Sequence, residues 1–124
     1  MTYLAAFDGG SRFVDHAELA RELEKDWKPS RLVRTPPGGC GEHTRPVDFT
    51  FSRGGKEVEG HTFDSGTCLY LDGDADLVVE FVAWYRKLVP SEFDLIFCDD
   101  SYSFDVVVPV GATGSDVMAM WDNA

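Results

Sequence analysis

Three aspartates, each separated from the next by one residue, lie near the middle of the chain and could bind calcium. Asp72, Asp74 and Asp76 match the D-x-D-x-D start of an EF-hand loop. Such a loop also needs a glycine at its sixth position and a bidentate glutamate at its twelfth, where this chain has Leu77 and Ala83. The pattern therefore favours the start of a helix, which needs one capping aspartate. The other two carboxylates are surplus to that local role.

Cys40 and His43 form a second candidate site, within a glycine-rich stretch. Their C-x-x-H spacing could supply two zinc ligands, but a structural zinc site usually has two compact pairs and only one is present. A thiolate beside a histidine could instead act as a nucleophile, although closeness in sequence does not establish the required geometry. A small enzyme using Cys40 and His43, or a metal bound by carboxylates, is therefore the alternative function.

Charge is the bulk property that most restricts the function. The chain has 124 residues and a net charge of −11. Residues 1–62 contain 9 basic and 10 acidic side chains, whereas residues 63–124 contain 2 basic and 12 acidic ones. A field this negative repels nucleic acids and anionic membranes and attracts cationic proteins. We therefore expect a cationic protein partner, no nucleic acid and no membrane.

Length and composition indicate a single domain over residues 1–124. The sequence is 44% hydrophobic and 13% aromatic, which is enough to form a core. Three cysteines without paired spacing argue against a disulfide framework and favour the cytoplasm. The first residues lack the basic flank of a secretory signal, so none is expected.

Hydrophobic periodicity predicts the elements that must position the candidate residues, in the order α-β-β-β-α-β-β-α. They are a helix over 14–27, a hairpin over 47–63, a strand over 67–71, a helix ending before Pro90, strands over 94–99 and 102–110, and a short helix over 115–121. Asp15 and Ser115 are the expected caps of the outer helices. The proline- and glycine-rich segment 29–46 is expected to be a long connection.

These elements predict an α+β fold: one mixed, mainly antiparallel five-stranded sheet with helices packed on one face. The passage through residues 67–99 fits a parallel strand–helix–strand crossover. In that case the ends of its two strands lie at the same edge of the sheet. Asp72, Asp74 and Asp76 would then lie near Asp99 and Asp100. Crowded like charges reduce stability, which points to a compensating use such as binding a metal ion or a basic protein.

The stretch EFVAWYRKLVPSEFDLIFCDDSYSFDVVVP, within residues 67–110, resembles the C-terminal half of small acidic immunity proteins from bacterial toxin–immunity systems. The likeness lies in the chain length, the α+β order, the acidity, and an amphipathic helix leading into a strand and an acidic turn. It implies a cytoplasmic, non-enzymatic protein that neutralises a toxin by covering its active site. Toxins that act on nucleic acids or nucleotides are often basic, which suits an acidic inhibitor surface.

We therefore expect a non-enzymatic immunity or inhibitor protein that neutralises a basic bacterial toxin without a cofactor. Besides the small enzyme, an accessory protein-interaction domain is the other alternative. The oligomeric state is not predicted. The expected partner contacts are Asp72, Asp74, Asp76, Asp99, Asp100 and Asp105, with Tyr102 as an aromatic anchor.

Overall fold

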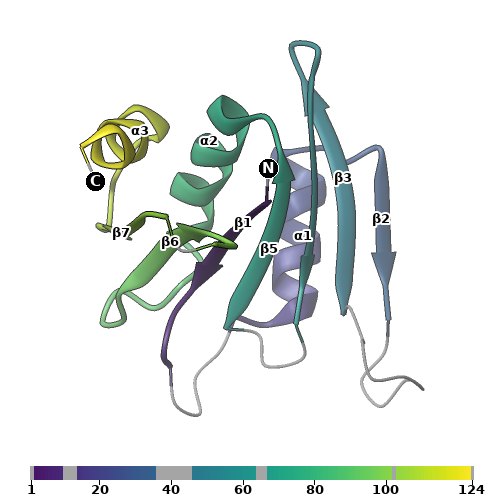
Figure 1. Cartoon of the computed structure of the whole chain (residues 1–124). Coiled ribbons are helices and arrows are strands. Elements are labelled where there is room, and N and C mark those ends of the chain that lie inside the picture. The colour runs from purple at the N-terminus through teal and green to yellow at the C-terminus, as the bar shows by residue number, and fades with distance from the viewer. Residues whose placement is uncertain (1, 10–13, 36–45, 64–66, 102, 124) are drawn as a thin grey trace.

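The computed structural model of the chain describes residues 2–9, 14–35, 46–63, 67–101 and 103–123. Within these residues it has an α+β fold of three helices and one seven-stranded, all-antiparallel open sheet (Figure 1). In chain order the elements are β1 (Thr2–Ala6), α1 (His16–Asp26), β2 (Arg31–Arg34), β3 (Val47–Arg53), β4 (Lys56–Thr62), β5 (Cys68–Gly73), α2 (Ala75–Tyr85), β6 (Leu95–Asp99), β7 (Asp105–Val108) and α3 (Gly114–Asp122).

The sheet has the order β2-β3-β4-β5-β1-β6-β7, so the first strand of the chain lies inside it. β1 pairs antiparallel with β5 on one side and with β6 on the other. β5 and β6 therefore run in the same direction but are not hydrogen-bonded to each other. The prediction of a mixed five-stranded sheet was wrong in both strand number and strand direction, because β1 occupies the place between the two strands of the expected parallel pair.

Two strands account for the missing elements. β1 has the sequence TYLAA, in which polar and apolar residues do not clearly alternate. Its side chains alternate between half-buried and buried because the strand lies between β5 and β6. β2 has the sequence RLVR and lies within the segment 29–46 that was expected to be an irregular connection. Its residues are mostly exposed, since it pairs only with β3 at the edge of the sheet. Short strands of this kind have too few residues for periodicity to identify.

Two local predictions are confirmed: the Asp15 cap of α1, and the turn of the hairpin over 47–63, for which the sequence indicates Gly54 and Gly55. Asp15 caps α1 by accepting a hydrogen bond from Ala17 N–H at 2.8 Å. Gly54 and Gly55 form the β3–β4 turn, and both have the positive φ that glycine adopts without strain. The expected cap of α3 was wrong: Thr113, two residues before Ser115, accepts from Asp116 N–H, and Asp116 accepts in return in a capping box.

The core lies between one face of the sheet and the helices, as Figure 1 shows for α1 and α2 behind the strands. Its rings form two groups: Trp27, Phe49, Phe51, Phe81 and Trp84 contact one another beneath β3, and Tyr3, Phe97, Phe104 and Trp121 do so beneath β1 and β6. The opposite face of the sheet, which we call the open face, is not covered by any helix of the described residues.

The turn between α2 and β6 is held by a buried arginine. Arg86 is only 3% exposed and donates hydrogen bonds to the carbonyl oxygens of Val89 at 3.4 Å, Ser91 at 3.4 Å and Phe93 at 2.8 Å. These bonds link the end of α2 to the segment leading into β6, so they fix where β6 begins and where its C-terminal aspartates lie.

Gly60 provides a direct test of the core. A Cβ atom at this position would lie 2.5 Å from the Phe49 ring and 2.9 Å from Leu71, because these side chains close over the β4 backbone. Since overpacking a well-packed core usually destabilises by about 1–3 kcal/mol, we expect Gly60→Ala to lower the free energy of unfolding by that amount. Urea denaturation measures it, and Ser52→Ala, at an exposed position on β3, serves as the control. Equal unfolding midpoints for the two variants would contradict this packing.

Candidate partner-binding surface

The ends of β5 and β6 converge at one edge of the sheet, on either side of the first residues of β1. Thr2 pairs with Asp72, and Tyr3 pairs with Asp99. The backbone N–H of Asp100 donates to the Thr2 carbonyl oxygen at 3.2 Å. We call this the acidic edge; it contains Asp72, Asp74, Asp76, Asp99 and Asp100.

The pKa of the Tyr3 hydroxyl reflects this convergence. Its pKa is raised first by burial and then by the negative charges of Asp99, Asp74 and Asp72. Carboxylates from two separate strand ends therefore act on the same ring. The expected meeting of the two strand ends is confirmed, although β1 lies between them instead of the two strands pairing directly.

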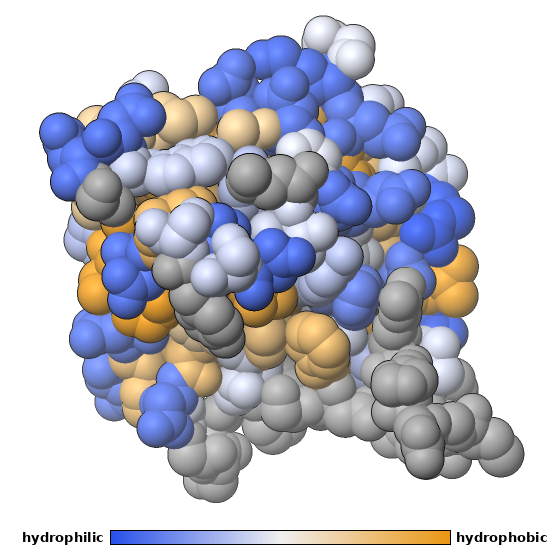
Figure 2. All heavy atoms as spheres, viewed as in Figure 1, coloured by the Kyte–Doolittle hydropathy of each residue, from blue (hydrophilic) through white to orange (hydrophobic). Residues whose placement is uncertain are grey.

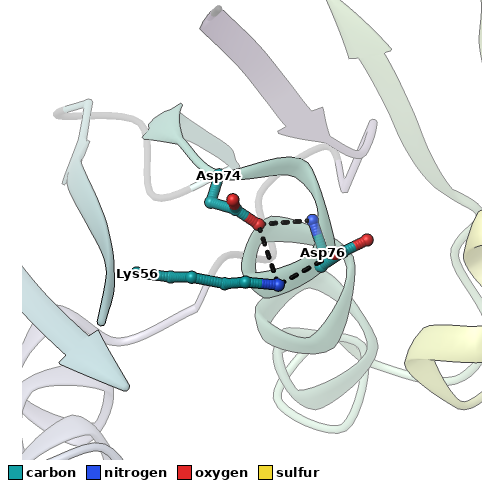
Figure 3. Close-up of polar contacts among 3 residues, drawn as sticks. All are labelled: Lys56, Asp74 and Asp76. Carbon is teal, nitrogen blue, oxygen red and sulfur yellow. Dashed lines mark hydrogen bonds and ion pairs between the residues drawn. The ribbon is translucent and has the colours of Figure 1, made fainter. Parts of the chain in front are cut away.

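Asp74 and Asp76 lie on the helix side of the acidic edge and interact with Lys56 (Figure 3). Asp74 caps α2 by accepting a hydrogen bond from Asp76 N–H at 3.0 Å. The Lys56 ammonium lies 2.9 Å from an Asp76 carboxylate oxygen and 3.7 Å from one of Asp74. The hydrogen bond with Asp76 is the largest of several contributions that raise the pKa of Lys56. Asp74 thus caps a helix, and the carboxylates of both Asp74 and Asp76 lie close to the Lys56 ammonium.

Asp99 is buried, at 2% exposure, and organises the β6–β7 turn. Its carboxylate accepts hydrogen bonds from Ser103 N–H at 2.7 Å, from the Ser103 hydroxyl, and from the Ser101 hydroxyl at 3.2 Å. The bond from the Ser103 hydroxyl is the largest of the causes that lower the pKa of Asp99. A carboxylate enclosed in this way has little surface to offer a partner, so its role is to shape the turn that presents Asp100.

The remaining charge forms a strip on the open face beside the acidic edge. Asp72 lies directly opposite Glu59 on β4, and Glu57 projects from the same face two residues away. Asp100 is exposed in the turn next to Thr2. We call this group the acidic strip: Glu57, Glu59, Asp72 and Asp100. Glu57 and Glu59 were not predicted as part of this site. Their alternation with Val58 indicates only that they lie on an exposed face of a strand, and it does not show which strand pairs with theirs.

A hollow of about 160 Å³ opens next to the acidic strip on the same face. Glu59, Asp72 and Asp48 contribute its carboxylates, and Arg31 lies 2.6 Å from Asp48 at its rim. The rings of His61 and Tyr70 form its wall and stack on each other with centroids 4.4 Å apart. Acidic side chains over aromatic rings suit a cationic side chain.

Two further predicted contacts lie elsewhere. Asp105 is exposed on the open face of β7, opposite Cys98, and is separated from β5 by β1 and β6. It therefore lies away from the acidic strip. Tyr102 lies outside the described residues.

The residues that carry the alternative chemistry are only partly described by the structure. Cys40 and His43 lie outside the described residues. Burial raises the pKa of the Cys68 thiol to about 11, with a smaller effect from Cys98, so this thiol stays protonated at neutral pH. In the described part of the chain, no three His, Cys, Asp or Glu side chains are grouped closely enough to hold a metal ion. None of the described helices is long and apolar enough to cross a membrane.

The structural role of Asp99 predicts a specific dependence of stability on pH. Because its folded-state pKa is lowered, its charged form stabilises the fold above the unfolded-state pKa of about 3.9, and this contribution is lost as pH falls through the folded value. We expect Asp99→Asn to unfold at a lower urea concentration than wild type at pH 7, with the gap narrowing below about pH 4.

The neighbouring Asp100→Asn is the matched control, since Asp100 is exposed. It should leave the unfolding midpoint nearly unchanged at both pH values. A difference in unfolding midpoint between wild type and Asp99→Asn that stays constant from pH 7 to pH 3 would contradict a role for the Asp99 charge.

Comparisons with protein-family models, with curated proteins and with solved structures found no match for this chain.

Proposed function

We propose that this protein is a non-enzymatic binding protein of the immunity type, which neutralises a basic partner protein by docking it on the acidic strip. The strip consists of Glu57, Glu59, Asp72 and Asp100. On this proposal the partner is a bacterial toxin, and both proteins meet in the cytoplasm. No cofactor takes part.

The observation that carries the proposal is the direct cross-strand pairing of Glu59 with Asp72. Like charges placed opposite each other in an antiparallel sheet are destabilising, whereas opposite charges contribute roughly 0.2–1 kcal/mol per pair. Cationic groups from a partner would relieve the repulsion between Glu59 and Asp72.

The overall charge supports the same function through the kinetics of association. A net charge of −11 attracts a basic protein over a distance of about one Debye length, roughly 8–10 Å at physiological salt. Such steering can raise association rates to about 10⁸ M⁻¹s⁻¹ or more at low salt. Fast association suits an inhibitor that must reach its target before the target acts.

The direct experiment is a rescue assay in bacteria. The C-terminal domain encoded by the gene directly upstream is expressed alone and together with this protein. We expect the domain to stop growth alone and this protein to restore it. A harmless upstream domain, or one whose toxicity this protein does not reduce, contradicts the proposed function.

The acidic strip predicts a change in association rate. Replacing Asp72 and Asp100 together by asparagine should slow binding of that domain by roughly tenfold at low salt and flatten its salt dependence, because charges near an interface act mainly on the association rate. Surface plasmon resonance at several salt concentrations measures both effects. Glu24→Gln, on the exposed side of α1, removes a charge far from the strip and should leave both unchanged.

A further inference from the structure

Side chains on the open face are arranged in rows that cross the strands, and the rows differ in chemistry. The row nearest the acidic edge contains Thr50, Glu59, Asp72 and Thr2, which are successive cross-strand neighbours. Four residues further along β1, Ala6 is the centre of a row without any charge. We call this the apolar row: Phe63, Cys68, Ala6, Ile96 and Val107.

The apolar row is accessible to a partner. Phe63 and Val107, at its two ends, are 40% and 49% exposed. Cys68, Ala6 and Ile96 between them are half-buried, and the raised pKa of Cys68 keeps that thiol uncharged. Figure 2 shows hydrophobic side chains over β6 and β7 on this side of the molecule, with hydrophilic ones above them. Exposed apolar side chains gathered in one place are typical of an interaction site.

A group of rings links the two rows. His61 contacts Phe63 edge-on with centroids 5.3 Å apart and stacks on Tyr70 with centroids 4.4 Å apart. The Tyr70 hydroxyl lies 3.3 Å from that of Thr2, so the group reaches the row of Asp72. Rigid aromatic side chains supply contact area with little loss of entropy, and they carry much of the energy at protein interfaces.

We infer that the open face binds a basic protein through an apolar strip that is flanked by lysine or arginine on one side only. This inference rests on the proposed function and specifies the partner's surface. The apolar row spans four strand spacings, or about 19 Å, and lies about 13 Å from the row of Glu59 and Asp72. An amphipathic helix of roughly 13 residues has the matching length, with apolar side chains on the row and basic ones toward the carboxylates.

A second copy of this chain fits the face less well than a basic partner. Two copies would each bring a net charge of −11 and a row containing Glu59 and Asp72 to the same interface. Repulsion at that level keeps proteins apart. The charge beside the apolar row therefore selects a cationic occupant.

The test uses two synthetic 14-residue helical peptides and does not depend on knowing the natural partner. One peptide has leucine along one face and lysine along one flank; in the other, every leucine is glutamine. We expect both to perturb amide NMR signals around Glu59 and Asp72, and only the leucine peptide to perturb Ala6, Ile96 and Val107. The leucine peptide should bind at least tenfold more tightly, since each apolar side chain buried adds to affinity.

Val107→Thr is the decisive variant because it keeps the side-chain shape and removes its apolar character. It should lower the affinity for the leucine peptide about fivefold and leave the affinity for the glutamine peptide unchanged. Val110→Thr is the matched control: Val110 is 62% exposed but lies in the turn after β7, outside the sheet. Both variants should melt at the wild-type temperature.

The outcomes separate this inference from the proposed function. Equal affinities for the two peptides, signal changes confined to the helices, or equal effects of the two valine variants would overturn the apolar row as a binding surface, while the rescue assay still judges the proposed function. If neither peptide perturbs Glu59 and Asp72, cationic docking on the strip is itself contradicted. A dimer that Val107→Thr dissociates would overturn the inference by assigning the face to a second copy.

Discussion

The pairing of β1 with β5 on one side and β6 on the other is the constraint on which the rest of the structure depends. In the strand order β2-β3-β4-β5-β1-β6-β7, β1 is the link between a four-strand part and a two-strand part. Its Tyr3 ring contacts Phe97 with centroids 5.6 Å apart and Trp121 at 5.4 Å, so the same strand joins the sheet to α3. Because β1 begins where β5 and β6 end, it also brings their terminal aspartates to one edge.

The helices cover one face of the sheet and leave the other, the open face, uncovered in the described residues. The covered face buries the aromatic side chains, and burying one large apolar side chain contributes roughly 1.5–3 kcal/mol. The open face keeps Phe63, Val33 and Val107 exposed and places Glu59 opposite Asp72. Exposed apolar side chains and like charges placed opposite each other do not by themselves favour folding. A local departure from what folding alone favours is most often found where a protein binds something else.

The aspartates of the acidic edge resemble one another in the sequence but have different roles in the structure. Asp74 caps a helix, Asp76 interacts with Lys56, and Asp99 is enclosed by the serines of a turn. A count of acidic residues therefore does not show which carboxylates already interact within the chain. The acidic strip on the open face instead combines Asp72 and Asp100 with Glu57 and Glu59 from β4, a strand that has little net charge in the sequence.

The sequence by itself determined the features that depend on neighbouring residues: the cap at Asp15, an aspartate cap for α2, the glycine turn of β3 and β4, the α+β class and the excess of negative charge. These follow from backbone geometry and side-chain type within a few positions. The tertiary structure alone decided that β1 enters the middle of the sheet, that Glu59 faces Asp72, and that Phe63, Ala6, Ile96 and Val107 form one row. Cross-strand neighbours are set by long-range pairing and register, and no local pattern carries that information.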